Sequence, residues 1–120
     1  MTEFPMLEQR RILVVEDEYL LAQEICEWLQ GAGVTVVGPA ATIAAALEAV
    51  RGTTQIDAAL VDLNLRGEMA YPVADALRQR GIRFVFLTGY DSGAIPARYK
   101  DVDRCEKPLD RPKVVHALFG

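Results

Sequence analysis

Residues 11–18 read Arg-Ile-Leu-Val-Val-Glu-Asp-Glu, an apolar run that stops at three consecutive acids. The uninterrupted aliphatic stretch 12–15 is typical of a strand buried on both faces, as in a parallel sheet. Over residues 19–30 apolar side chains recur at helical spacing, and glycines follow at 31 and 33. The chain therefore begins with a strand followed by a helix, and the three acids stand where that strand ends.

The same strand-then-helix unit recurs along the chain. Further strands are predicted at residues 34–37, 58–61 and 84–87 and near Val102, and further helices begin near Thr42, Pro72 and Asp110. Only thirteen residues, 89–101, separate the fourth strand from the fifth, so a shortened fourth helix is expected. Right-handed connections then give an α/β fold, a flavodoxin-like, doubly wound five-stranded parallel sheet in the order 2-1-3-4-5.

The composition fits one globular domain spanning residues 1–120. Of the residues, 51% are hydrophobic and 25% are charged, and the net charge of −4 argues against direct binding of nucleic acid. No apolar stretch approaches the ~20 residues of a membrane span, and the charged N-terminus is not a secretory signal. Two distant cysteines without a Cys-x-x-Cys motif indicate neither a zinc site nor a disulfide framework, so a reducing cytoplasmic location is expected.

Chemically active side chains follow the predicted strands. They are Glu16 and Asp17 after the first strand, Asp62 after the third, Thr88 after the fourth and Lys107 after the fifth. A doubly wound sheet gathers such residues at one edge. Converging carboxylates repel one another, and a hard cation such as Mg²⁺ relieves that repulsion. A carboxylate, a magnesium ion, a lysine and a hydroxyl are the parts of a phosphoryl-transfer site, with Asp62 on the central strand as the nucleophile.

Simpler explanations exist for each of these residues alone. The acids at 16–18 suit the start of a helix, Asp62 can cap a loop, and Lys107 can be a solvated surface charge. The combined interpretation is favoured because these explanations would have to coincide at four strand ends. Three arginines, Arg78, Arg80 and Arg83, are expected at a solvated helix end, and His116 is expected to be an ordinary surface or half-buried histidine.

Four motifs in order connect the chain with a known family. They are LVVEDE (13–18), LVDLNL (60–65), FLTGY (86–90) and EKPL (106–109). With these motifs, residues 11–119 resemble the receiver domain of two-component response regulators, whose fold is the CheY-like form of the sheet predicted above. The resemblance implies a phosphoacceptor switch, not an enzyme acting on a separate substrate.

The resemblance also implies particular roles. Asp62 would accept a phosphoryl group from a phosphohistidine on a sensor histidine kinase or histidine phosphotransferase, and Lys107 would contact that group from a cis Lys107-Pro108 bond. The Mg²⁺ ligands would be the carboxylates of Asp17 and Asp62 and the backbone carbonyl of Asn64, with Glu16 acting mainly through water. Thr88 would turn towards the phosphoryl oxygen as a switch.

Two departures from the family pattern bear on switching. Glu16 stands where an Asp is common, and Arg104 stands where receivers usually carry an aromatic switch residue. Tyr90 is the expected replacement, because the Thr-Gly-Tyr run is similar to a subgroup with a Phe-x-Thr-Gly-Tyr motif that is frequently found as stand-alone domains. The face around Tyr90 and residues 91–100 is expected to be loosely packed and to contact a downstream protein target.

Other functions stay open at this point. The chain could be a phosphorelay intermediate or phosphate sink, or a pseudo-receiver that binds partners without phosphorylation. A phosphatase with an aspartyl nucleophile is disfavoured because the first strand lacks an Asp-x-Asp pair. A flavin or nucleotide carrier is disfavoured because three acids replace the phosphate-binding loop that it needs.

Overall fold

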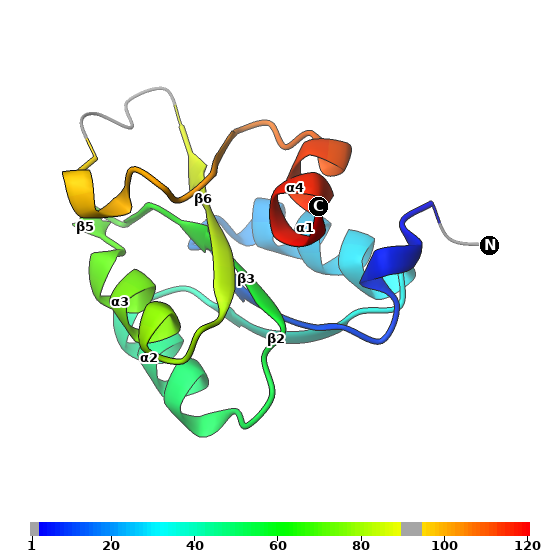
Figure 1. The fold of residues 1–120 in the computed structure, drawn as a ribbon, viewed down its shortest axis with the longest axis horizontal. Coiled ribbons are helices and arrows are strands. Elements are labelled where there is room, and N and C mark those ends of the chain that lie inside the picture. The colour runs from blue at the N-terminus through cyan, green and yellow to red at the C-terminus, as the bar shows by residue number, and fades with distance from the viewer. Residues whose placement is uncertain (1–2, 90–94) are drawn as a thin grey trace.

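The computed structural model describes residues 3–89 and 95–120, which form a parallel sheet covered by helices on both faces (Figure 1). The sheet has the order β2-β1-β3-β6-β7. Its strands are β1 (Arg11–Val15), β2 (Thr35–Ala40), β3 (Ala58–Asp62), β6 (Arg83–Thr88) and β7 (Arg104–Glu106). Counted along the chain, this is the predicted order 2-1-3-4-5, and the α/β fold is confirmed.

Helices and short elements connect these strands. The helices are α1 (Tyr19–Gly31), α2 (Ile43–Gly52), α3 (Tyr71–Gln79) and α4 (Arg111–Phe119), and single 3-10 turns form η1 (Pro5–Leu7) and η2 (Ala97–Tyr99). A small antiparallel hairpin, β4 (Asn64–Leu65) with β5 (Glu68–Met69), follows β3 and was not predicted. In the part of the chain that is described, no helix combines the length and apolar character needed to cross a membrane.

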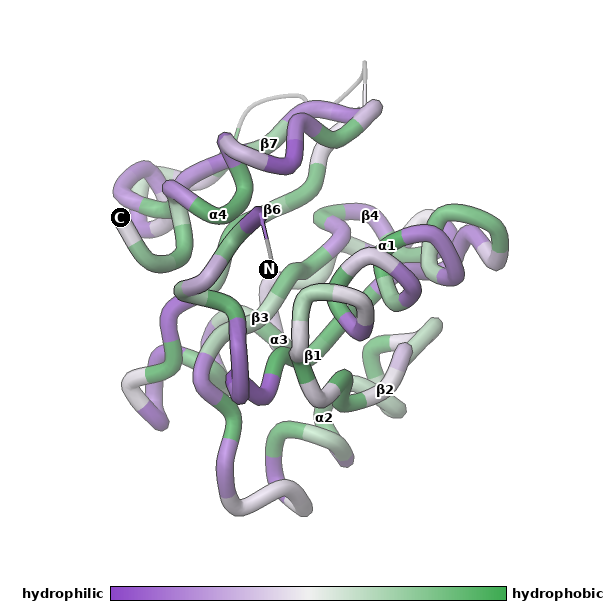
Figure 2. Tube along the Cα trace, turned by 90° about the vertical axis from the view of Figure 1, so that its right-hand side faces the viewer, coloured by the Kyte–Doolittle hydropathy of each residue, from purple (hydrophilic) through white to green (hydrophobic). Residues whose placement is uncertain are grey.

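Side chains that point to alternate faces of the buried strands divide the core into two layers. Residues such as Leu13, Val61 and Phe86 pack with α2 and α3, whereas Val14, Leu60 and Leu87 pack with α1 and α4. The tube is hydrophobic through most of β1 and β3 (Figure 2). The central strands are therefore buried on both sides, and their polar groups lie at the strand ends.

Side-chain caps fix two of the helices where the sequence predicts them. The Thr42 hydroxyl accepts a hydrogen bond from the Ala45 amide at 3.1 Å, and the Asp110 carboxylate accepts one from the Lys113 amide at 3.2 Å. Both caps satisfy an amide that the first helical turn leaves without a partner.

Two of the arginines expected at a solvated helix end also make hydrogen bonds to neighbouring helices. Arg80 donates to the backbone carbonyls of Val50 in the last turn of α2 and of Thr53 and Thr54 just beyond it. Arg83 donates to the Leu118 carbonyl in the last turn of α4 at 2.5 Å. Arg80 and Arg83 are exposed, as expected, and they also reach carbonyls that the end of each neighbouring helix leaves without partners.

Two strand boundaries differ from the prediction. Strand β2 continues through Gly38 and Pro39 to Ala40, because its register with β1 shifts there and Gly38 adopts a φ of +93°. A side chain at Gly38 would bring its Cβ to 2.8 Å from the Ala40 nitrogen. The last strand begins at Arg104, two residues after Val102. The described residues 95–103 contain only η2, in agreement with a shortened fourth helix.

Candidate functional site

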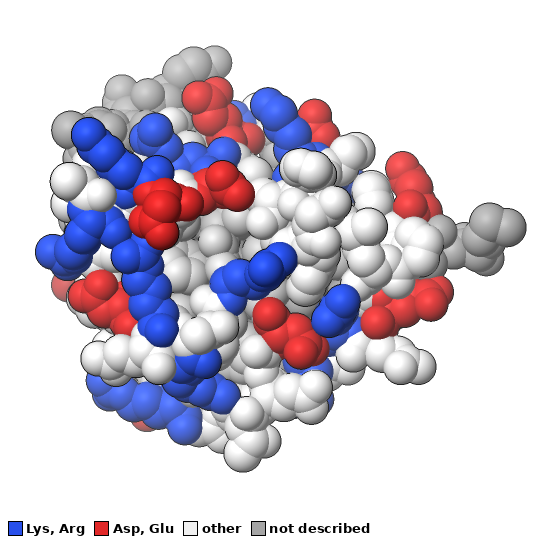
Figure 3. Space-filling model, in the orientation of Figure 1, with Lys and Arg blue, Asp and Glu red and all other residues white. Residues whose placement is uncertain are grey.

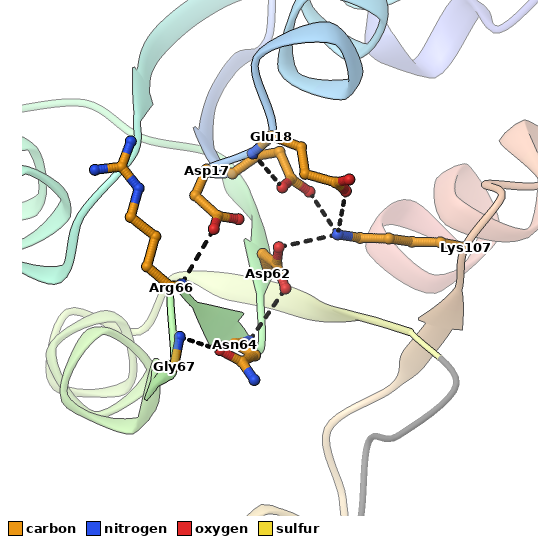
Figure 4. Close-up of polar contacts among 8 residues, drawn as sticks. Asp17, Glu18, Asp62, Asn64, Arg66, Gly67 and Lys107 are labelled. Carbon is orange, nitrogen blue, oxygen red and sulfur yellow. Dashed lines mark hydrogen bonds and ion pairs between the residues drawn. The ribbon is translucent and has the colours of Figure 1, made fainter.

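The polar residues at the strand ends meet at one edge of the sheet. Glu16 and Asp17 follow β1, Asp62 and Thr88 are the last residues of β3 and β6, and Lys107 follows β7. Because these strands are parallel neighbours in the sheet, their carboxyl ends lie together (Figure 4). The convergence predicted from the sequence is confirmed for these five residues.

Three carboxylates form the centre of the site. One oxygen from each of Glu16, Asp17 and Asp62 lies within 4.8 Å of the other two. Glu16 is 1% exposed and Asp62 5%, so neither carboxylate is solvated as a surface acid would be. An all-oxygen cluster with this spacing can hold a hard divalent cation.

Backbone amides hold each of these carboxylates from one side. Glu16 Oε2 accepts from the Glu18 amide at 3.0 Å, Asp17 Oδ2 from the Arg66 amide at 3.1 Å and Asp62 Oδ1 from the Asn64 amide at 3.1 Å. Arg66 reaches Asp17 because it sits at the tip of the β4–β5 hairpin with a φ of +53°. The hairpin therefore closes one side of the site.

Lys107 supplies the positive charge. Its Nζ lies 2.9 Å from Asp62 Oδ2, 2.9 Å from Glu16 Oε1 and 3.3 Å from Glu18 Oε2 (Figure 4). The Lys107-Pro108 bond is cis, as the resemblance implies. Glu18 was not predicted to belong to the site, although its place as the third acid after the first strand was a visible signal.

Burial and charge shift the acidities within the cluster. Burial raises the pKa of Glu16 to about 7, and the neighbouring Asp62 carboxylate adds to the rise. Burial acts to lower the pKa of Lys107, but its contacts with Asp62 and Glu16 outweigh that effect and raise it. Burial acts to raise the pKa of Asp17, but hydrogen bonding with Glu16 and within the cluster lowers it overall. Lys107 is therefore a permanent cation in a crowded group of acids.

A cavity of about 350 Å³ opens over this cluster. Its lining includes Asp17, Asp62, Asn64, Thr88 and Lys107. Thr88 is buried and Asn64 is exposed. These predicted residues therefore line one cavity. Tyr90, the remaining predicted site residue, lies outside the described residues, and His116 is exposed on α4 and does not line this cavity.

The comparisons with known proteins agree with this geometry. Residues 12–119 match the family model described as response regulator receiver domain. SdrG from Sphingomonas melonis Fr1 is 40% identical, with 93% of this chain and 98% of that chain covered and a TM-score of 0.81. The BeF3-activated conformation of SdrG from Pseudomonas melonis Fr1 is 38% identical, with 94% and 98% covered and a TM-score of 0.78.

A more distant similarity is to the receiver domain of the PhyR response regulator from Erythrobacter litoralis. It is 26% identical, with 95% of this chain and 93% of that chain covered and a TM-score of 0.76. The comparison with curated proteins gives no match.

Proposed function

The chain belongs to the response regulator receiver family of two-component signalling, whose members are phosphoacceptor switches rather than enzymes, and from this premise we propose that Asp62 is its phosphoacceptor. The donor is a phosphohistidine on a sensor histidine kinase or histidine phosphotransferase, the partners typical of the family. The observation that carries the proposal is the position of Asp62, with its Oδ2 atom 2.9 Å from Lys107 Nζ inside a cluster of three carboxylates. In this proposal residues 1–120 form one receiver domain that acts in the cytoplasm.

The reaction transfers one phosphoryl group between two side chains. A carboxylate oxygen of Asp62 forms a new bond to phosphorus while the phosphorus–nitrogen bond of the phosphohistidine breaks. The electron pair of that bond stays on the imidazole nitrogen, and the product on Asp62 is an acyl phosphate. Asp62 attacks as a carboxylate, and its Oδ2 atom lies 2.9 Å from the Lys107 ammonium.

Lys107 and Thr88 bind the transferred group. The Lys107 ammonium has three donors, so it can turn one from an acid to a phosphoryl oxygen without losing every carboxylate contact. Thr88 lines the same cavity and has a hydroxyl that can donate to a second phosphoryl oxygen. These contacts stabilise the negative charge on the phosphoryl oxygens during transfer.

The residues present fit a magnesium ion. Their donors are all oxygens, and among the described residues Glu16 Oε1 is a buried atom that accepts no hydrogen bond although it is paired with Lys107. Asp17, Asp62, the Asn64 carbonyl and, through water, Glu16 would hold the ion. When bound, Mg²⁺ neutralises negative charge on the phosphoryl oxygens.

The output of the switch is a change in binding to a downstream protein. Arg104 is exposed on β7, so no aromatic side chain is available at that position. Thr88 and Tyr90 therefore carry the response, as in the Phe-x-Thr-Gly-Tyr subgroup to which we assign the chain from Phe86, Thr88, Gly89 and Tyr90. The BeF3-activated conformation of SdrG, which is 38% identical to this chain, supports a conformational response to phosphorylation.

The test is phosphorylation of the purified protein by acetyl phosphate and by a phosphorylated histidine phosphotransferase, with and without Mg²⁺. One hydroxylamine-labile phosphoryl group per chain, as an acyl phosphate gives, is expected on the parent and none on Asp62→Asn. The matched control is Asp103→Asn, which changes an exposed acid outside the cavity. Equal labelling of Asp62→Asn would overturn the assignment, and an unlabelled parent would indicate a pseudo-receiver.

A further inference from the structure

Tyr99 is a buried tyrosine on a single turn of helix. It is 1% exposed, although the turn that carries it, η2, is otherwise exposed at Ala97 and Arg98. Its hydroxyl donates to Asp75 Oδ1 on α3 at 2.5 Å, and the Tyr71 carbonyl lies 3.4 Å away. Hydroxyl-to-carboxylate bonds are short and strong, so Asp75 supplies the polar partner that a buried tyrosine requires.

The ring of Tyr99 joins two elements of the fold. It stacks on Tyr71 at 4.8 Å between centroids and 8° between planes, and it meets the edge of Phe86 at 6.0 Å and 78°. Tyr71 is the first residue of α3, and Phe86 lies on β6 two residues before Thr88. Because side chains two apart on a strand share a face, Tyr99 packs on the side of the sheet to which Thr88 also points.

Charged groups strengthen the same junction. Arg78 on α3 donates to the Arg98 carbonyl at 2.7 Å and pairs with Asp101 at 2.6 Å. Arg98 lies 3.6 Å from Asp75 Oδ2, and its guanidinium is 4.6 Å from the centroid of the Tyr99 ring. Figure 3 shows basic and acidic side chains side by side on the flank where Figure 1 places α3 and η2.

We propose that the Asp75–Tyr99 pair is a latch that fixes η2 to α3 and β6, and that it stays closed when Asp62 is phosphorylated. The contacts of Tyr99 come from α3 and β6, and opening them would expose an aromatic ring and break a charge-assisted hydrogen bond. The conformational response therefore does not extend to residues 97–101. This second part rests on the proposed function.

Three amide protons report on the latch directly. The amides of Tyr99, Lys100 and Val102 donate to the carbonyls of Pro96, Ala97 and Tyr99 at 2.9, 3.1 and 3.0 Å. Their hydrogen exchange, measured by NMR on the full chain, is expected to become about tenfold faster in Tyr99→Phe and in Asp75→Ala. Tyr99→Phe keeps the stacked ring, so it removes the hydroxyl without emptying the core.

Further variants separate the latch from a general loss of stability. Asp75→Asn keeps an acceptor oxygen for the Tyr99 hydroxyl and is expected to retain most of the protection of the three amides from exchange. Glu48→Ala removes an exposed carboxylate from α2 and is expected to leave the three amides unchanged. The double variant Tyr99→Phe/Asp75→Ala is expected to exchange no faster than the faster single variant, because both changes break one bond. Unchanged exchange in both single variants, or additive effects in the double variant, would overturn the latch.

The second part is tested by the same exchange measurement on the parent protein after addition of Mg²⁺ and beryllofluoride. The three amides are expected to keep their exchange rates within about twofold while the resonances of Thr88 and Lys107 shift. Faster exchange at Tyr99 or Val102 together with those shifts would show that the latch opens on activation. No shift at Thr88 or Lys107 would overturn the proposed function, and with it the second part of the inference, whereas the variants alone decide whether the latch exists.

Discussion

Replacing Glu16 by Gln tests the electrostatics of the site without a ligand. The Glu16 side chain is almost fully buried, one of its oxygens faces Lys107 at 2.9 Å, and the other accepts from the Glu18 amide. Gln keeps the length and an acceptor for that amide, but it removes the carboxylate charge. The variant therefore isolates the cost of ionising Glu16 beside Asp62.

The size and sign of the effect follow from the pKa of Glu16. Burial raises this pKa from 4.5 to about 7, which makes the ionised form cost the folded state about 3 kcal/mol at 1.36 kcal/mol per pKa unit. Between those values the folded protein binds a proton that the unfolded chain has lost. The free energy of unfolding therefore falls as pH rises through this window, and the full cost is present above about pH 8.

Urea unfolding in EDTA from pH 5 to pH 8 measures this difference. The stability of the parent relative to Glu16→Gln is expected to fall by about 2–3 kcal/mol across that range. Glu18→Gln is the matched control, because it removes a neighbouring but exposed carboxylate. Parallel curves for the parent and Glu16→Gln, or a parent that gains relative stability with rising pH, would refute the reasoning.

Three further predictions follow from the same structure. Mg²⁺ affinity, measured by calorimetry, is expected to increase with pH through the pKa of Glu16 and to level off above about pH 8, because protonation of Glu16 makes the cluster less negative. A flat profile from pH 5.5 upward would contradict this. Lys107→Ala is expected to lower the free energy of unfolding at pH 8 in EDTA by about 2 kcal/mol. This is less than for a fully buried ion pair, because the lysine side chain is 19% exposed. The same change is expected to slow labelling by acetyl phosphate, whereas the control Lys113→Ala is expected to do neither. Arg80→Ala leaves three carbonyls at the end of α2 without their donor and is expected to cost about 1–3 kcal/mol in thermal unfolding. A loss no larger than that of Arg51→Ala would count against this role.

The sheet and its polar edge could be predicted because burial leaves a local signature. Strands buried on both faces are continuous apolar runs, and Asp62 and Thr88 are the polar residues at which two of them end. Once the strand order is known, chain topology alone brings those residues together. Arg66 could not be found in this way, because it contributes a backbone amide whose position depends on the hairpin turn.

The parts that sequence reasoning missed depend on partners far apart in the chain. Arg80 and Arg83 are exposed, as predicted, but their hydrogen bonds to the ends of α2 and α4 depend on residues distant in the sequence. Tyr99 lies among glycines, prolines and charged residues that favour a loop, and only Tyr71, Asp75 and Phe86 explain why it is buried. A local pattern does not encode such contacts, so the expectation of a loosely packed segment was wrong at Tyr99.

The order of the functional groups along the chain has a consequence for synthesis. Glu16, Asp17, Asp62 and Thr88 all precede Lys107, which follows β7, the shortest strand of the sheet. During synthesis the acids therefore leave the ribosome before the lysine that pairs with Glu16 and Asp62 in the folded protein. The ion pairs of Lys107 with both acids can form only after that final strand has been made.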